Sequence, residues 1–182
     1  MLFRSAMRKL QVYTAGITNP YTITEGEKYR SFLSGLPYAL TGAQKRVLED
    51  IKSDLMGNSV MNRLVQGDVG SGKTIVAELA LLMVIESGYQ GAMMAPTEVL
   101  AKQHYDSFVK QLTSYGIRVE LLVGSAPAKE KKRIYQGLKE HTIDLVVGTH
   151  ALIQEKVEYK ELALVITDEQ HRFGVRQREM LA

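Results

Sequence analysis

Short apolar runs alternate with longer amphipathic or charged stretches along most of this chain. Four apolar runs predict buried strands, at residues 90–95, 118–124, 143–150 and 162–169. A shorter run at 63–66 also resembles a strand. The stretches between them predict helices at residues 74–85, 98–114 and 129–139. Because short apolar strands that alternate with helices form parallel sheets with helices on both faces, we expect an α/β fold.

The first 35 residues lack this alternation. Residues 1–12 favour a short basic amphipathic helix, 14–26 are rich in the residues of loops, and 27–33 favour another helical turn. No complete core is encoded here. We therefore expect a short N-terminal helical arm at 1–35, the remnant of an upstream region, and one domain at 36–182.

A glycine-rich turn precedes the most apolar helix. Residues 67–74 read GDVGSGKT, which matches the P-loop pattern G-x-x-x-x-G-K-[ST] between a predicted strand and a predicted helix. Glycines let the backbone curl around phosphates, and the N–H groups that begin the helix face the anion. Lys73 offers charge to the phosphates and Thr74 a hydroxyl to Mg²⁺. The predicted ATP-binding residues here are Gly67, Asp68, Val69, Gly70, Ser71, Gly72, Lys73 and Thr74.

Polar residues follow the predicted strands at their carboxyl ends. In a parallel sheet these ends share one edge, and ligands bind there. The segments that we expect to converge are the glycine-rich turn, Thr97, Gly124 with Ser125, Thr149 with His150, and Asp168 with Glu169.

Two adjacent carboxylates end the last predicted strand. Acids are common at solvated strand ends, but beside a P-loop Asp168 is suited to hold Mg²⁺ and Glu169 to polarise the attacking water. The predicted catalytic residues are therefore Lys73, Asp168 and Glu169, and the predicted Mg²⁺ ligands are Thr74 and Asp168.

A helix from about 42 to 55 begins at Thr41. Thr41 and Gln44 form the pattern of a capping box, in which each side chain bonds the other residue's backbone N–H. Gln44 is also suited to contact adenine, just upstream of the P-loop. The sequence pattern favours the capping role of Gln44 over the adenine contact, and the two roles are compatible with each other.

Composition narrows the classes of protein. The 182 residues carry a net charge of +3 and no cysteine, which excludes disulfides and cysteine zinc sites. No apolar run reaches transmembrane length, and the basic N-terminus has no apolar stretch typical of a signal peptide. We expect a cytoplasmic protein without a membrane partner. The weakly basic balance is compatible with a nucleic-acid partner.

Five motifs in order resemble the RecG-like DNA helicases of superfamily 2, over about residues 28–182. They are LTGAQ at 40–44, QGDVGSGKT at 66–74, APTE at 95–98, GTHAL at 148–152 and DEQHRFGV at 168–175. The Mfd-like translocases share GDVGSGKT and RFGV but usually read DEEQ in the acidic box, so Gln170 and His171 favour the RecG-like family.

The resemblance implies a RecA-like P-loop NTPase fold and further roles for particular residues. Gln44 would contact adenine. Gln170 and His171 would couple the nucleotide to DNA or to the next domain, although a surface histidine also accounts for His171. The residues that would line the DNA path are Thr97, Gly124, Ser125, Thr149 and His150.

The chain departs from the family's pattern where it stops. The family's motif III, its second RecA-like domain and its wedge domain are missing. The resemblance therefore implies the first motor domain of an ATP-dependent helicase that remodels branched or forked DNA, with little unwinding by this chain alone. The alternatives are an Mfd-like translocase domain, a stand-alone nucleotide-dependent switch, or a DNA-binding module that uses ATP structurally.

Basic residues on the predicted helices suit DNA phosphates, unless they form only a solvated helix face. With aromatics at 7% and no Trp, base stacking should add little, so we expect weak, salt-sensitive binding that ignores sequence. These basic residues are Lys102, Lys129, Lys131, Lys132 and Arg133.

Overall fold

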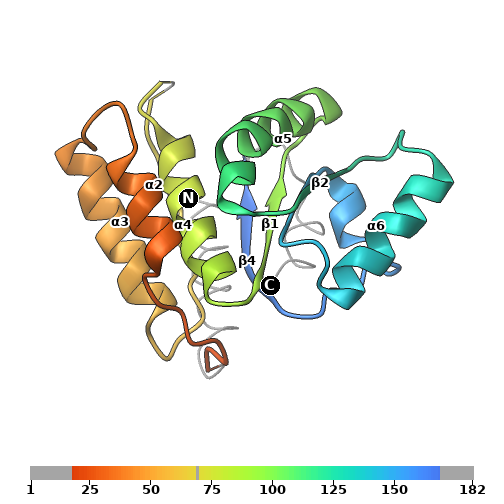
Figure 1. Ribbon diagram of the computed structural model, residues 1–182, viewed down its shortest axis with the longest axis horizontal. Coiled ribbons are helices and arrows are strands. Elements are labelled where there is room, and N and C mark those ends of the chain that lie inside the picture. Colours follow the sequence, from red (N-terminus) through yellow and green to blue (C-terminus); the bar gives the residue numbers. More distant parts are fainter. Residues whose placement is uncertain (1–17, 69, 169–182) are drawn as a thin grey trace, which may run out of the picture. The chain divides into compact units, whose positions relative to one another are not determined.

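The computed structural model describes residues 18–68 and 70–168 (Figure 1). The chain divides into two compact units, with the boundary between Met83 and Val84 inside helix α4. Our expected domain boundary between residues 35 and 36 stays a prediction.

The first unit is helical and holds α2 (Glu27–Ser34), α3 (Gly42–Leu55) and most of α4 (Lys73–Glu86). Thr41 caps the start of helix α3, as predicted, and the helix buries Leu48, Ile51 and Leu55, a stripe with helical spacing. Asn19 closes the other end of α3, because its side-chain amide donates to the carbonyls of Leu55 and Gly57 at 3.0 and 3.2 Å.

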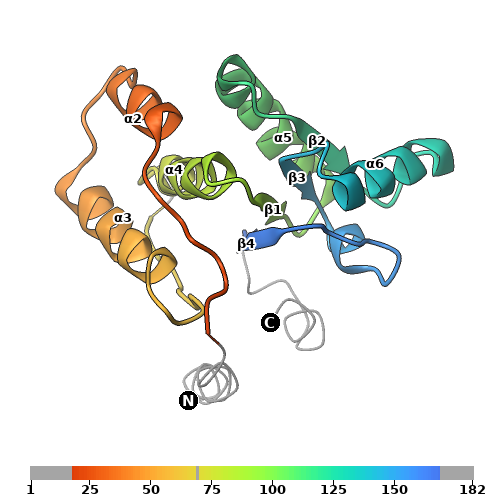
Figure 2. The same ribbon diagram turned by 60° about the horizontal axis from the view of Figure 1, so that its bottom comes forward.

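The second unit contains a parallel sheet of four strands in the order β2-β3-β1-β4 (Figure 2). The strands are β1 (Gln90–Met94), β2 (Val119–Leu122), β3 (Leu145–Gly148) and β4 (Leu162–Thr167). Helix α5 (Glu98–Leu112) connects β1 to β2, and α6 (Ala128–Glu140) connects β2 to β3. The two connections run in opposite directions along the sheet, so right-handed crossovers place α5 and α6 on opposite faces. The predicted α/β fold with a parallel sheet is confirmed.

One face of this sheet packs against α6. Ile134 and Leu138 of α6 form a cluster with Ala92, Met94 and Val146 from the two central strands. Positions 92 and 94 share a face because side chains alternate along a strand. The 3-10 helix η2 (His150–Ile153) closes the same cluster with Ala151 and Leu152.

Gln90 is the polar exception in this core. Its fully buried side-chain amide donates to the carbonyls of Leu138 and Ile143 at 3.0 and 2.9 Å. Its carbonyl oxygen accepts from the backbone N–H groups of Lys160 and Glu161. One side chain therefore joins the end of α6, the start of β3 and the segment that leads into β4.

The expected strand at 63–66 was wrong, because these residues belong to no strand of the described chain. Arg63 instead forms ion pairs with Asp50 and Asp54 of α3, at 3.0 and 2.8 Å. Leu64 is 39% exposed, unlike a residue of a covered parallel strand. An apolar run gives only the propensity for a strand, whereas a strand also needs a neighbour to pair with.

The other predicted elements are confirmed with shifted ends. Helix α5 ends at Leu112, and Thr113–Tyr115 form a separate 3-10 turn. Strand β3 ends at Gly148, so Thr149 lies beyond it. The expected helix at 1–12 lies outside the described residues. Among residues 18–68 and 70–168, no helix combines the length and apolarity that crossing a bilayer requires.

Candidate functional site

The glycine-rich loop lies in the first unit, where α4 begins at Lys73. Gly70 and Gly72 have φ angles of 82° and 77°, in the left-handed region that favours glycine. A Cβ atom on Gly67 would lie only 2.7 Å from Oγ of Ser71. A Cβ atom on Gly72 would collide with Nε2 of Gln44. Torsion therefore favours glycine at positions 70 and 72, and a side chain at position 67 or 72 would have to displace the side chain of Ser71 or Gln44.

Lys73 reaches back over this loop. Its Nζ donates to the carbonyl oxygens of Gly67 at 2.7 Å and Asp68 at 2.8 Å. The side chains of Lys73 and Thr74 are exposed. The first backbone N–H groups of α4 have no acceptor within their own helix, and they lie beside these two side chains. An ammonium group, a hydroxyl and free N–H groups fit a phosphate chain carrying Mg²⁺.

Gln44 joins helix α3 to the loop. The predicted capping box is present: Gln44 Oε1 accepts from Thr41 N–H at 2.8 Å, and Gln44 N–H donates to Thr41 Oγ1 at 3.2 Å. Nε2 also donates to the carbonyl of Ser71 at 3.0 Å, a contact that the sequence did not predict. Nε2 also lies 3.5 Å from the carbonyl oxygen of Gly72, a second acceptor, so the amide keeps a lone pair on Oε1 for a ligand. The adenine contact stays a prediction.

In the second unit, Asp168 directly follows β4. Its backbone N–H donates to the carbonyl of Met94 at 2.8 Å, which extends the pairing with β1. Its Oδ2 lies 2.8 Å from Nε2 of His104 on α5. Thr74 belongs to the first unit and Asp168 to the second, so their joint binding of one Mg²⁺ stays a prediction.

Sequence reasoning missed His104. The sequence feature that could have indicated it is a histidine on the apolar stripe of α5. The other residues of this stripe are Ala101, Phe108 and Leu112, all three fully buried. Nothing in the local sequence indicates that its partner is an acid 64 residues later.

The start of α5 contacts the turn after β2. Thr97 is the N-cap of α5, and its hydroxyl accepts from Leu100 N–H at 3.3 Å. The next residue, Glu98, accepts from the backbone N–H and the hydroxyl of Ser125, at 2.9 and 2.5 Å. The hydroxyl bond, followed by the backbone bond, lowers the pKa of Glu98. Both donors of Ser125, a residue predicted to line the DNA path, are therefore engaged by Glu98, which the sequence did not single out.

Thr149 and His150 differ in their exposure to solvent. Thr149 is 2% exposed, and its Oγ1 has no hydrogen-bond partner among the described residues. His150 is exposed at the start of η2. Gly124 is also exposed, and its carbonyl accepts from Lys131 Nζ at 2.5 Å. Of the two predicted side chains after β3, only that of His150 is accessible.

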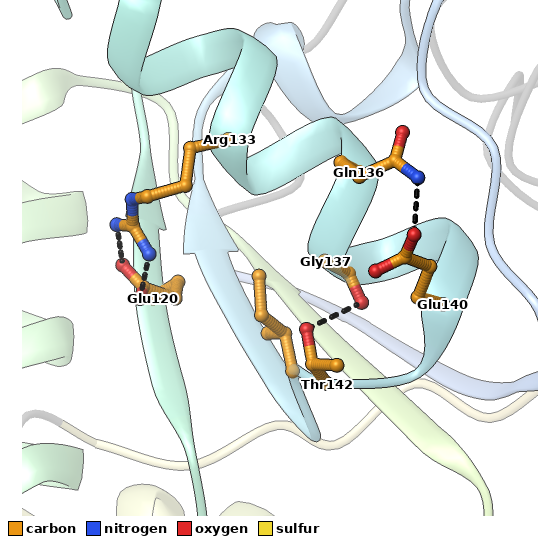
Figure 3. A pocket seen from close by; sticks show the side chains of 7 residues that line it. Glu120, Arg133, Gln136, Gly137, Glu140 and Thr142 are labelled. Atoms are coloured by element: carbon orange, nitrogen blue, oxygen red, sulfur yellow. Dashed lines mark hydrogen bonds and ion pairs between the residues drawn. The ribbon is translucent and has the colours of Figure 1, made fainter.

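A shallow groove lies between β2 and α6 (Figure 3). Arg133 crosses it with two parallel hydrogen bonds to Glu120, both of 2.8 Å. The guanidinium group of Arg133, one of the basic residues predicted to contact DNA phosphates, is therefore already paired with a carboxylate. Lys129 and Lys132, by contrast, are exposed on α6.

Four predicted site residues lie outside the described chain. They are Val69, Glu169, Gln170 and His171.

Comparisons with known proteins place these features in context. A family model described as DEAD/DEAH box helicase matches residues 41–182. The ATP-dependent DNA helicase RecG of Thermotoga maritima is 53% identical over 157 residues, which is 86% of this chain and 20% of the relative. RecG of Bacillus subtilis is 51% identical over 179 residues, 98% of this chain and 25% of the relative. The chain thus spans about a fifth to a quarter of the length of these curated relatives.

Solved structures agree. A structure of RecG bound to a three-way DNA junction matches with a TM-score of 0.85 and 47% identity, over 93% of this chain and 23% of that one. The UvsW helicase from bacteriophage T4 matches with a TM-score of 0.61 at 18% identity, over 87% of this chain and 56% of that one, and supports the fold alone.

Proposed function

Since the chain belongs to the DEAD/DEAH box helicase family, we propose that it is the first RecA-like motor domain of a RecG-like helicase that couples ATP hydrolysis to the remodelling of branched DNA. The observation that carries this proposal is the loop at 67–74. Two left-handed glycines shape it, Lys73 bridges two of its carbonyls, and α4 begins directly behind it. The similarity to proteins named ATP-dependent DNA helicase supports the choice of reaction.

The loop residues bind and orient the nucleotide. ATP with Mg²⁺ supplies the phosphoryl group and the positive charge that stabilises its transfer. Lys73 would exchange its two carbonyl acceptors for phosphate oxygens, because a hydrogen bond between two charged groups is stronger than one to a neutral carbonyl. Thr74 and Asp168 would hold the metal ion, and Glu169 would polarise the attacking water. Gln44 would contact adenine while its other bonds keep α3 on the loop.

DNA is the proposed partner of the second unit. The solved structure of a 47% identical RecG contains a three-way DNA junction. Exposed groups of this unit that suit phosphates include the His150 ring, the Gly124 backbone and the ammonium groups of Lys102, Lys129 and Lys132. Ser125 can donate to a phosphate only after Glu98 releases it. Thr97 and Thr149 would then shape the path rather than contact DNA with a free hydroxyl.

Replacing Lys73 tests the nucleotide site. We expect Lys73→Ala to weaken MgADP binding about tenfold or more, because a charged hydrogen bond contributes about 1.5–3 kcal/mol. Isothermal titration calorimetry on both proteins measures the loss.

Lys110→Ala is the control for this experiment. It removes the same charge from the exposed end of α5, and we expect unchanged affinity. Equal affinity for the wild type and Lys73→Ala would contradict the proposed role of the loop.

A further inference from the structure

We propose that His104 is a positioning residue for Asp168. Its imidazole holds one carboxylate oxygen of Asp168 by a hydrogen bond and leaves the other oxygen for the metal ion. The inference rests on the proposed function, since it takes Asp168 as a ligand of Mg²⁺.

The direction of the hydrogen bond follows from the two groups. Nε2 of His104 lies 2.8 Å from Oδ2 of Asp168, a normal hydrogen-bond length. An ionised carboxylate only accepts, so Nε2 carries the proton of this bond. The imidazole N–H therefore restrains one carboxylate oxygen and leaves the other oxygen accessible to a cation.

The position of His104 on α5 argues against a chance contact. It shares the inward stripe of the helix with Ala101, Phe108 and Leu112, and its side chain is 17% exposed. A polar ring at such a position costs stability unless it is hydrogen-bonded. Its ring stacks on that of Phe108, with centroids 6.3 Å apart and planes 24° apart. This stacking restricts the rotation of the imidazole.

Asp168 is thereby held at two points from two elements. Its backbone N–H bonds to Met94 of β1, and its carboxylate bonds to α5. Oδ1 has no hydrogen-bond partner among the described residues, and the side chain is 31% exposed. One oxygen is thus restrained and the other is accessible. Hydrogen bonds to metal-binding carboxylates commonly contribute about 10–100-fold to metal affinity.

Two variants separate hydrogen bonding from packing. His104→Phe keeps an aromatic ring on Phe108 but removes the donor. His104→Gln keeps an N–H at similar reach. The full chain saturated with ADP is titrated with Mn²⁺, and bound metal is counted by electron paramagnetic resonance. We expect His104→Phe to weaken Mn²⁺ binding about 10–100-fold and His104→Gln to retain most of the affinity.

Binding of ADP without metal, in the presence of a chelator, is the second measurement. It should be equal in all variants, because the hydrogen bond acts only through the metal ligand. Unchanged Mn²⁺ affinity in His104→Phe would overturn the inference. An equal loss in His104→Phe and His104→Gln would also overturn it, because only packing would then explain the effect.

Asp168→Asn distinguishes this inference from the proposed function. If Asp168→Asn leaves Mn²⁺ affinity unchanged, the proposed metal site is wrong and the role of His104 fails with it. If Asp168→Asn weakens binding and His104→Phe does not, the metal site stands and the inference about His104 alone is wrong.

Discussion

Gly72 shows how one residue can serve both backbone geometry and packing. Gly70 and Gly72 have similar positive φ angles, but only at Gly72 would a Cβ atom meet a neighbour, Nε2 of Gln44. An alanine at either position costs about 1–2 kcal/mol of backbone strain. Gly72→Ala must also push Gln44 away from the Ser71 carbonyl. We therefore expect Gly72→Ala to lower the free energy of unfolding more than Gly70→Ala does, as measured by urea denaturation.

The double variant Gly72→Ala/Gln44→Ala is the check. Gln44→Ala removes the side chain that the new methyl group would meet, so the two losses should not add. Additivity within about 0.3–0.5 kcal/mol would mean that crowding by Gln44 has no part in the effect.

At the scale of elements, Gln90 joins α6, β3 and the segment before β4 through four hydrogen bonds. Gln90→Ala leaves the Ile143 carbonyl and the Glu161 N–H without these bonds, whereas the Lys160 N–H still donates to the Leu138 carbonyl. A buried group left unsatisfied costs about 1–3 kcal/mol, and water entering the space recovers part of that. We expect a loss of about 3 kcal/mol or more in the free energy of unfolding, measured by urea denaturation.

Gln136→Ala is the matched control. Gln136 is exposed on α6, and its side chain bonds only Glu140 among the described residues. Gln136→Ala should therefore change the free energy of unfolding by no more than about 0.5 kcal/mol. A Gln90→Ala protein within 1 kcal/mol of the wild type would show that the four bonds contribute little.

At the scale of the whole molecule, the net charge is small, at +3. Arg133 is paired with Glu120, and the ammonium group of Lys131 is engaged by the Gly124 carbonyl. The electrostatic attraction to DNA should therefore be modest. We expect dissociation constants at or above about 10⁻⁶ M at physiological salt, independent of base sequence. Fluorescence anisotropy with a labelled oligonucleotide across a salt series measures this.

The variant Lys129→Ala/Lys132→Ala provides the comparison. If both lysines meet phosphates, the slope of log affinity against log salt should fall in magnitude by about 2. Affinity that is flat with salt, or that changes strongly with sequence at fixed length, would be incompatible with binding through phosphates.

The sequence by itself determined what depends on neighbours along the chain. Thr41 caps α3 through Gln44, three residues away, and the loop at 67–74 contains its own glycines, lysine and threonine. The parallel α/β class also followed, because the apolar runs alternate with helices. These features are encoded within a few residues, where local sterics and hydrogen bonding decide.

Only the tertiary structure decided which distant groups meet. Gln44 bonds Ser71 across 27 residues, Glu98 bonds Ser125 across 27, and His104 bonds Asp168 across 64. Likewise, residues 63–66 have strand propensity, but Arg63 pairs with α3. Such contacts depend on how the elements pack, and the local pattern of a sequence does not specify that packing.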